Sequence, residues 1–304
     1  MPKIPTAESV ALFRAAGALH PEPGLRNPDR LAARLLPWRP PVRALVKVPG
    51  LRRAISRAVR RKWAAGMWYE VIRTKYMDDV LSAAGAAQVV LLGAGFDSRA
   101  HRMRPEIGAA TVFEVDQPEM SARKQERVRR LPRSEVRYLA ADLEKDDLAA
   151  VLRTGGFDPE EKTVVLWSGV APYLRPEGVE TTLRWFARLA PGSELVFDYC
   201  WQEILDGTTV IPEAEAVLRD VAARGEPWRW GIRKGHAEQL LDAHRLTLVE
   251  DLEVAAAQRR YLTRADGSVQ GPVWFFGGFL HARVPVTAGR EDETVARAPS
   301  STGP

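Results

Sequence analysis

Residues 88–99 read QVVLLGAGFDSR, and residues 111–118 read TVFEVDQP. The first stretch is an apolar run that stops at a pair of glycines, and the second is an alternating run that stops at Asp116. This pattern predicts two strands. The first is followed by a tight glycine turn, in which backbone N–H groups can approach a ligand closely. A carboxylate at the end of the second strand lies where a ribose diol binds. We therefore expect a nucleoside-binding half of a sheet.

The rest of the chain alternates between strand-like and helical stretches. Helical stretches, notably 118–130 and 176–189, separate the first strand-like runs, and this rhythm indicates a parallel sheet covered on both faces. Two late runs follow with a loop and no long helix between them, which indicates an antiparallel pair at one edge. The predicted fold is α/β, a Rossmann-like, seven-stranded, mostly parallel sheet with an antiparallel last strand. The strand-like runs are 89–92, 111–115, 136–140, 163–167, 194–197, 246–252 and 273–284.

Three segments follow from this alternation. Residues 1–84 read as helical, so we expect a helical N-terminal cap that includes a cofactor-binding helix ending at Gly85. Residues 85–285 are expected to form the core, with a helical insert at about 205–235. Residues 286–304 are small, polar and charged, which predicts a disordered tail.

Composition excludes several classes of protein. The 304 residues are 45% hydrophobic and 27% charged, an ordinary globular balance. There is no apolar stretch of about twenty residues and no signal-peptide pattern, so we expect a soluble, cytoplasmic protein without a membrane partner. Cys200 is the only cysteine, which excludes an internal disulfide and a cysteine zinc cluster. The five histidines show no metal-ligand spacing, so we expect no metal.

A net charge of +5 raises nucleic acid as a possible partner. Much of the excess lies in residues 43–62, RALVKVPGLRRAISRAVRRK. No zinc-finger spacing, recognition helix or aromatic–basic platform accompanies it. We therefore interpret this segment as a solvated helix face and expect no nucleic-acid partner. The sequence gives no indication of the oligomeric state.

The glycine turn indicates which nucleoside is bound. It departs from the dinucleotide pattern G-x-G-x-x-G, because Ser98 stands at the third glycine position. That glycine permits close packing of helix and strand under a pyrophosphate, which a ligand without a pyrophosphate does not need. An antiparallel last strand is typical of seven-stranded methyltransferases. These features favour S-adenosyl-L-methionine, and a nicotinamide-dependent oxidoreductase is the alternative from another class.

Five motifs in a fixed order give a more specific indication. Together they resemble the leucine carboxyl methyltransferase-like family, over about residues 63–284, and the chain is identified as a member of its bacterial small-molecule branch. The resemblance implies a class I methyltransferase fold, S-adenosyl-L-methionine as cofactor and S-adenosyl-L-homocysteine as product. The motifs are RTKYMDD (73–79), LLGAGFDSR (91–99), VFEVDQP (112–118), ADL (141–143) and WSGVAPYL (167–174).

The resemblance also implies roles for cofactor-binding residues. Arg73 is expected to bind the methionyl carboxylate through its planar fork, unless it only pairs with Glu70 one helical turn earlier. Gly93 and Gly95 are expected to line the turn beneath the methionyl group. Asp116 is expected to accept hydrogen bonds from the ribose hydroxyls.

Four further residues complete the expected cofactor site. Glu114 is a second candidate for the ribose. Asp142 and Leu143 follow the third strand, where members of the family bind the edge of the adenine ring. Asp142 can instead cap the next helix. Ser168 stands where family members carry a glutamate near the cofactor's ammonium group. A serine accepts one hydrogen bond there but cannot neutralise a cation.

The acceptor pocket is expected between the carboxyl edge of the sheet and the cap, with walls from residues before Gly85 and around 212–230. We expect O-methylation of a carboxyl or hydroxyl group on a small specialised metabolite; the alternative is C-methylation of an aromatic molecule such as an indole. No residue is assigned as the catalytic base. Four side chains that could act as one lie near expected strand ends or cap segments: Tyr173, Asp198, Tyr199 and His236. The lining candidates are Tyr173, Tyr199, Trp228, Trp230 and His236.

Overall fold

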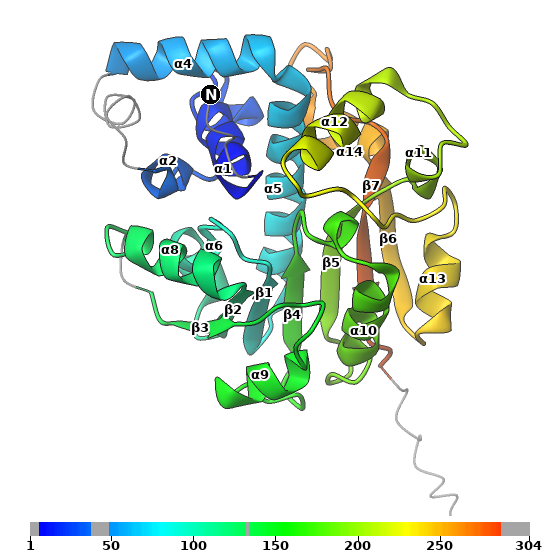
Figure 1. Ribbon diagram of the computed structural model, residues 1–304. Helices are drawn as coiled ribbons and strands as arrows, with labels where there is room; N and C mark the ends of the chain where they lie inside the picture. Colours follow the sequence, from blue (N-terminus) through cyan, green and yellow to red (C-terminus); the bar gives the residue numbers. More distant parts are fainter. Residues whose placement is uncertain (1–5, 38–48, 132–133, 287–304) are drawn as a thin grey trace, which may run out of the picture.

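The computed structural model describes residues 6–37, 49–131 and 134–286. In this part of the chain seven strands form one sheet in the order β3-β2-β1-β4-β5-β7-β6 (Figure 1). β7 runs antiparallel to both of its neighbours, β5 and β6, and the other strand pairs are parallel. The predicted α/β class, with its mostly parallel seven-stranded sheet, is confirmed. The strands are β1 (Gln88–Leu92), β2 (Thr111–Asp116), β3 (Val136–Ala140), β4 (Thr163–Trp167), β5 (Glu194–Cys200), β6 (Thr247–Glu253) and β7 (Gly277–Arg283).

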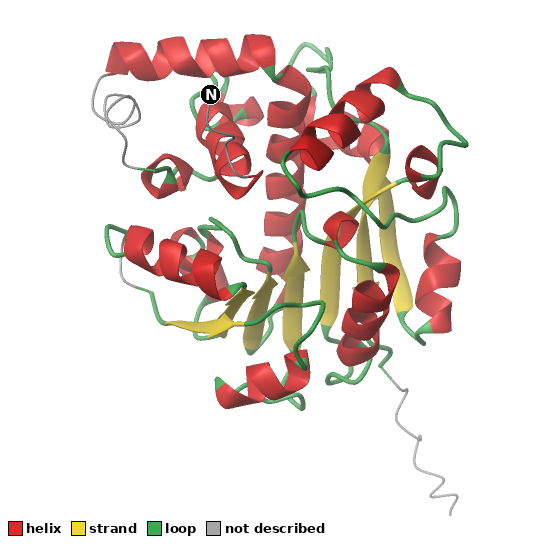
Figure 2. Cartoon of the chain, in the orientation of Figure 1, coloured by secondary structure: helices red, strands yellow, loops and turns green. Residues whose placement is uncertain are grey.

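Helices cover both faces of the sheet (Figure 2). Because side chains alternate along a strand, Val89 and Leu91 of β1 pack into one apolar cluster, and Val90 and Leu92 pack into the other. The helices include α5 (Ala64–Ala84) and α14 (Val254–Leu262) on the first face, and α9 (Leu148–Thr154), α10 (Pro176–Phe186) and α13 (Ala237–Ala243) on the second.

The N-terminal helices lie beyond the edge at which the parallel strands end (Figure 1). α1 (Thr6–Gly17) packs against α5, α2 (Ala32–Leu35) and α4 (Pro49–Lys62). α5 stops at Gly85, whose φ of 54° is the left-handed conformation that ends many helices. α12 (Pro212–Ala223) lies in the predicted insert. The predicted tail at 286–304 lies almost wholly outside the described residues.

The remaining helices are short, apart from α8. They are α6 (Arg99–Arg102), α7 (Arg104–Ile107), α8 (Pro118–Val128) and α11 (Gln202–Leu205), with two 3₁₀ turns, η1 (Pro23–Leu25) and η2 (Ala171–Tyr173). None of the helices in the described ranges is long and apolar enough to cross a membrane.

The late strands differ from the prediction in two respects. β6 and β7 pair antiparallel at the edge, as predicted, but the nine-residue helix α14 joins them where a loop was expected. This helix forms because Val254, Ala257 and Leu262 recur at helical spacing and bury one face against α5. β7 also begins later than the apolar run, at Gly277, where the chain passes too close to the Tyr199 carbonyl for any side chain.

Candidate functional site: two adjoining cavities

The first cavity has a volume of about 490 Å³ and lies at the carboxyl ends of the first four strands. We call it the glycine-loop cavity, after the loop that follows β1. Of the eight residues predicted to bind a cofactor, six line it, and Gly95 and Glu114 do not. The sequence motifs therefore meet in one place in the fold. The six are Arg73, Gly93, Asp116, Asp142, Leu143 and Ser168.

Asp116 is held in place by the backbone. The Gly95 N–H donates to its Oδ2 at 2.6 Å, and the Gln117 N–H donates to its Oδ1 at 2.7 Å. Burial raises the pKa of the Asp116 carboxyl, although these two N–H groups oppose the shift. A carboxylate accepts about four hydrogen bonds. Two accepting positions thus remain beside the cavity, which matches the two hydroxyls of a ribose.

The loops after β1 and β4 close on each other. Gly93 has a φ of +60°, and a side chain there would collide with Val170. Gly169 has a φ of +67°, and a side chain there would collide with the Arg73 guanidinium. Both positions need glycine for conformation and for space.

Asp142 does not cap the next helix, α9, whose N-cap is Asp147. Asp142 Oδ1 accepts from the Glu144 N–H at 3.0 Å, so it caps the turn after β3. Its Oδ2 pairs with Lys145 Nζ at 2.7 Å, and that contact lowers the pKa of the Asp142 carboxyl. The residue nevertheless lines the cavity beside Leu143. Capping the turn and facing a ligand are therefore compatible.

Contrary to the prediction, Glu114 does not line the glycine-loop cavity. Strand alternation turns it to the face of the sheet that α8 covers, where its carboxylate lies 2.6 Å from Lys124 Nζ. Both side chains are 2% exposed. Burial raises the pKa of Glu114 to about 7. Glu114 is thus a core residue and does not reach the glycine-loop cavity.

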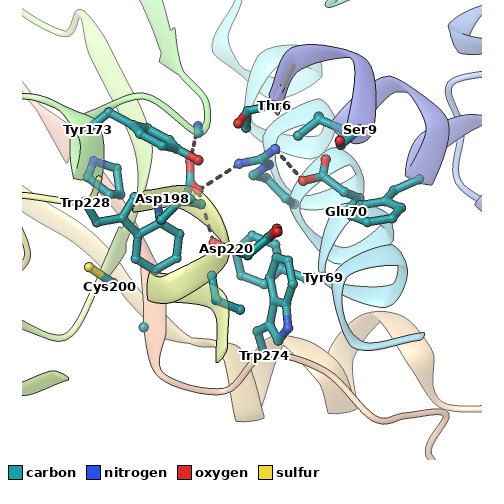
Figure 3. A pocket seen from close by; sticks show the side chains of 18 of the residues that line it. Thr6, Ser9, Tyr69, Glu70, Tyr173, Asp198, Cys200, Asp220, Trp228 and Trp274 are labelled. Carbon is teal, nitrogen blue, oxygen red and sulfur yellow. Dashed lines mark hydrogen bonds and ion pairs between the residues drawn. The ribbon is translucent and has the colours of Figure 1, made fainter. Parts of the chain in front are cut away.

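The second cavity has a volume of about 380 Å³, and its walls come from α1, α5, α12 and the segments around β5 and β7. We call it the aromatic cavity (Figure 3). It lies between the N-terminal helices and the insert, where the acceptor pocket was predicted. Among the predicted lining residues Tyr173, Tyr199 and Trp228 are present. The aromatic side chains around it are those of Phe13, Trp63, Tyr69, Tyr173, Tyr199, Trp228, Trp274 and Phe276.

Two of the predicted lining residues, Trp230 and His236, do not line the aromatic cavity. Trp230 is 8% exposed and packs on Phe197 in the sheet core, because the chain crosses the end of β5 just after Trp228. His236 is exposed, with its Nδ1 3.0 Å from the Lys234 carbonyl oxygen. Tyr199 lines the cavity, but its hydroxyl donates to Asp251 Oδ1 on β6 at 2.6 Å.

The two cavities share a wall. Residues from α1, α5 and the loop after β4 line both of them. The two cavities are therefore neighbours in the fold. The shared residues are Thr6, Val10, Arg73, Gly169 and Tyr173.

A largely buried polar cluster, which we call the wall cluster, lies at this boundary and consists of Tyr69, Glu70, Arg73 and Asp198. Figure 3 labels three of its members, Tyr69, Glu70 and Asp198. Arg73 Nη1 donates to Asp198 Oδ2 at 2.9 Å, and Nη2 donates to Glu70 Oε1 at 2.5 Å. Asp198 also accepts from Tyr69 Oη at 3.1 Å and from the Gly169 N–H at 2.5 Å. These bonds hold the side chains of α5 against the end of β5.

The charge of Arg73 is secured by this cluster. Burial alone would lower the pKa of Arg73, but the carboxylates of Glu70 and Asp198 raise it well above its usual value. Burial raises the pKa of Glu70, although Arg73 opposes that shift. The predicted Glu70–Arg73 ion pair is thus real, and it uses one of five guanidinium N–H groups. Three N–H groups remain after the bond to Asp198, so Arg73 keeps donors for a ligand in the glycine-loop cavity.

The sequence analysis missed Tyr69, Asp97 and Gly169 as residues of the two cavities. Asp97 lines the glycine-loop cavity and pairs with Arg99, which outweighs burial and lowers the pKa of the Asp97 carboxyl. The sequence feature that could have indicated Asp97 is its position in the GFDSR motif. Asp198 carried only the weak signal of an acid at a strand end. Within the described ranges no group of acidic, histidine or cysteine side chains is arranged to hold a metal.

Known proteins resemble this chain in sequence. The family model described as Leucine carboxyl methyltransferase matches residues 7–187. The chain belongs to the leucine carboxyl methyltransferase family. A relative from Mycolicibacterium smegmatis is 35% identical over 216 residues, which cover 66% of this chain and 68% of that protein. A relative from Frankia alni is 37% identical over 62% of this chain and 66% of its own length. Both are named, by inference, as S-adenosyl-L-methionine-dependent methyltransferases.

The share of the chain that is matched differs between relatives. A Mycobacterium avium protein of the same name is 40% identical, and the match spans 41% of each chain. Among solved structures, a DUF574 family protein from Streptomyces avermitilis superposes with a TM-score of 0.53 at 20% identity. It covers 78% of this chain and 91% of its own, and it shows the shared fold.

As a member of this family the protein is a methyltransferase, and S-adenosyl-L-methionine is its cofactor. The glycine-loop cavity fits this molecule by its chemistry. Asp116 offers two accepting positions for a diol, and Arg73 offers a cation with spare donors for a carboxylate. No nicotinamide chemistry is needed to account for the site.

Proposed function

We propose that the protein transfers a methyl group from S-adenosyl-L-methionine in the glycine-loop cavity to an oxygen atom of a small specialised metabolite in the aromatic cavity. The observation that carries this proposal is the shared wall, where Arg73, Gly169 and Tyr173 line both cavities. Methyl transfer needs the donor carbon and the acceptor atom in line and in contact. Two cavities that share lining residues support such an arrangement.

The cofactor side is proposed to work as follows. Arg73 donates its spare N–H groups to the methionyl carboxylate, and Asp116 accepts from both ribose hydroxyls. Asp142 and Leu143 meet the adenine edge, and Ser168 accepts a hydrogen bond from the ammonium group. When bound, the cofactor supplies a methyl group that its sulfonium already activates. The protein therefore has to orient the acceptor and exclude water.

The acceptor side is proposed to take a small, largely apolar, planar molecule. A volume of about 380 Å³ lies in the range of small-molecule sites, near its lower end. Trp228 and Tyr173 lie edge to face with centroids 6.2 Å apart, and Trp228 approaches Phe276 at 6.4 Å. Such walls stack on planar rings. The same walls suit an aromatic carbon acceptor, so C-methylation is the second outcome that the experiment separates.

The domain roles and the compartment complete the proposal. Residues 1–84 are proposed to act as a cap, with 205–235 as the insert that closes the acceptor side. α1 supports this role, because Thr6 and Val10 line both cavities and Arg224 Nη1 donates to Ser9 Oγ at 3.0 Å. We propose the cytoplasm as the compartment, where Cys200 stays a buried free thiol.

The test is incubation of the purified protein with a metabolite extract and methyl-labelled cofactor, followed by mass spectrometry. We expect label in a small molecule, on oxygen. Calorimetry with S-adenosyl-L-homocysteine checks the cofactor site independently. Absence of binding together with absence of label transfer would contradict the proposal, whereas label on carbon would replace O-methylation by C-methylation.

A further inference from the structure

Asp198 is a buried carboxylate that faces the acceptor. It lies near the end of β5, is 4% exposed and lines the aromatic cavity. Its Oδ2 accepts from Tyr69 and Arg73, and its Oδ1 accepts from the Gly169 N–H. A carboxylate has about four accepting positions. The contacts among the described residues fill three, so one position on Oδ1 is left for a hydrogen-bond donor.

Asp198 shares the aromatic cavity with two other carboxylates, Glu70 and Asp220. The described residues that line it include no lysine and no histidine. Burial raises the pKa of Tyr69 and of Tyr173, so neither phenol is a base at neutral pH. Burial also raises the pKa of Cys200 to about 12. Asp220 pairs with Arg224 in a partly exposed contact, and Glu70 Oε1 pairs with Arg73 in the wall cluster.

The charges of the wall cluster select against an anionic acceptor. Arg73 is the cation of the cluster, and two carboxylates, Glu70 and Asp198, already pair with it. Arg73 is proposed to meet the methionyl carboxylate from the glycine-loop cavity, whereas a carboxylic acid in the aromatic cavity would set its charge against the carboxylate of Asp198, and like charges repel strongly in a buried region. A neutral hydroxyl instead adds a donor for the open position on Asp198.

We propose that Asp198 binds the hydroxyl group of a neutral, planar acceptor and receives its proton, so that hydroxyl compounds rather than carboxylic acids are the substrate class. This inference rests on the proposed function. In the step an oxygen lone pair forms the O–CH₃ bond while the S–CH₃ bond breaks and its electron pair goes to sulfur. The O–H bond breaks and its proton goes to Asp198 Oδ1, which later releases it to water. The proton becomes strongly acidic as the new bond forms, so a carboxylate is basic enough to take it.

The first experiment measures binding and needs no turnover. Calorimetry of the protein saturated with S-adenosyl-L-homocysteine compares 2-naphthol with 2-naphthoic acid, two planar molecules that differ in the group offered to Asp198. We expect 2-naphthol to bind at least about tenfold more tightly, since a hydrogen bond to a charged group distinguishes them. Asp198→Asn is expected to abolish this preference.

Asp78→Asn is the matched control. Asp78 is a carboxylate on α5 that pairs with Arg99 at 2.8 Å and with Arg102 at 2.6 Å, outside both cavities. This variant is expected to lose stability but to keep the preference for 2-naphthol. Should Asp198→Asn fail to fold, the comparison of the two naphthalenes in the unaltered protein still decides the question.

The second experiment identifies the product class. Labelled products from the metabolite extract are treated with mild alkali, which releases labelled methanol from methyl esters and leaves methyl ethers intact. We expect the label to stay, on oxygen. Labelled methanol, label on carbon or nitrogen, a preference for 2-naphthoic acid, or no binding of either naphthalene would overturn the inference while the methyl transfer itself stands. Failure to bind S-adenosyl-L-homocysteine would overturn the proposed function and the inference with it.

Discussion

The glycine-loop cavity and the aromatic cavity adjoin, yet they are built in different ways. The first is made where successive strands end, and its Asp116 is fixed by backbone N–H groups of neighbouring loops. The second brings together α1 and the end of α12, which lie far apart in the sequence, with Ser9 bonded to Arg224 and Thr6 bonded to Glu226. On the proposed function, cofactor binding thus depends on side chains that strand ends and loop backbone hold in place, whereas acceptor binding depends on side chains of helices packed over the sheet. The sheet can stay the same while the acceptor changes.

Arg73→Ala tests the wall between the two cavities and should have the largest effect. Removal of a buried cation leaves Glu70 and Asp198 unpaired, which typically costs about 3–5 kcal/mol. We expect that loss in the free energy of unfolding from urea denaturation, together with weaker binding of S-adenosyl-L-homocysteine. A loss below about 1 kcal/mol would mean that the cluster does not hold the wall together.

Asp116→Asn tests the cofactor side alone. Replacement of one accepting oxygen by a donor should cost roughly 1.5–3 kcal/mol of binding free energy, or about ten- to a hundredfold in affinity. Calorimetry with S-adenosyl-L-homocysteine measures it, and the 2′-deoxy analogue is the control that only the unaltered protein should discriminate against. Equal discrimination by the variant would place the ribose contact on another residue.

Trp228→Ala tests the acceptor side alone. Loss of its contacts with Tyr173 and Phe276 removes an aromatic wall, and each aromatic pair contributes roughly 0.5–1.5 kcal/mol. We expect weaker 2-naphthol binding with unchanged affinity for S-adenosyl-L-homocysteine, both measured by calorimetry. Equal weakening of both ligands would show that the two cavities are not separable.

The Glu114–Lys124 pair gives the smallest effect, and it tests whether Glu114 belongs to the core. Burial raises the pKa of Glu114 from 4.5 to about 7. The folded state then holds a proton that the unfolded state has lost, so stability falls as pH rises from about 4.5 through about 7. Between pH 6 and pH 7 we expect a fall of about 1 kcal/mol in the free energy of unfolding. Glu114→Gln should remove this dependence without changing S-adenosyl-L-homocysteine affinity; a tenfold loss of affinity would return Glu114 to the cofactor site.

Most of the fold could be predicted because its signals are local. Buried parallel strands read as apolar runs such as the one in β1, and the two glycines after it supply backbone conformations that other residues avoid. The helix α14 was not predicted, because it contains few apolar residues and becomes buried only by packing against α5. Local patterns do not show which distant helix covers them.

The site divides in the same way. Residues at strand ends, such as Asp116 and Ser168, could be predicted because the strand brings them to a known edge. Trp228 and Trp230 could not be told apart by sequence, since only the path of the chain past β5 sends one into the cavity and the other into the core. The partners of Asp198 come from α5 and the loop after β4, so its place in the wall cluster needed the assembled fold.

A crystal structure of the protein with S-adenosyl-L-homocysteine tests the central claim most directly. The account predicts the ligand in the glycine-loop cavity, with its ribose hydroxyls on Asp116 and its carboxylate on Arg73. Its sulfur atom should face the aromatic cavity between Gly169 and Tyr173, with an open path to Asp198. A ligand in the aromatic cavity, or a sulfur atom turned away from the shared wall, would contradict the account.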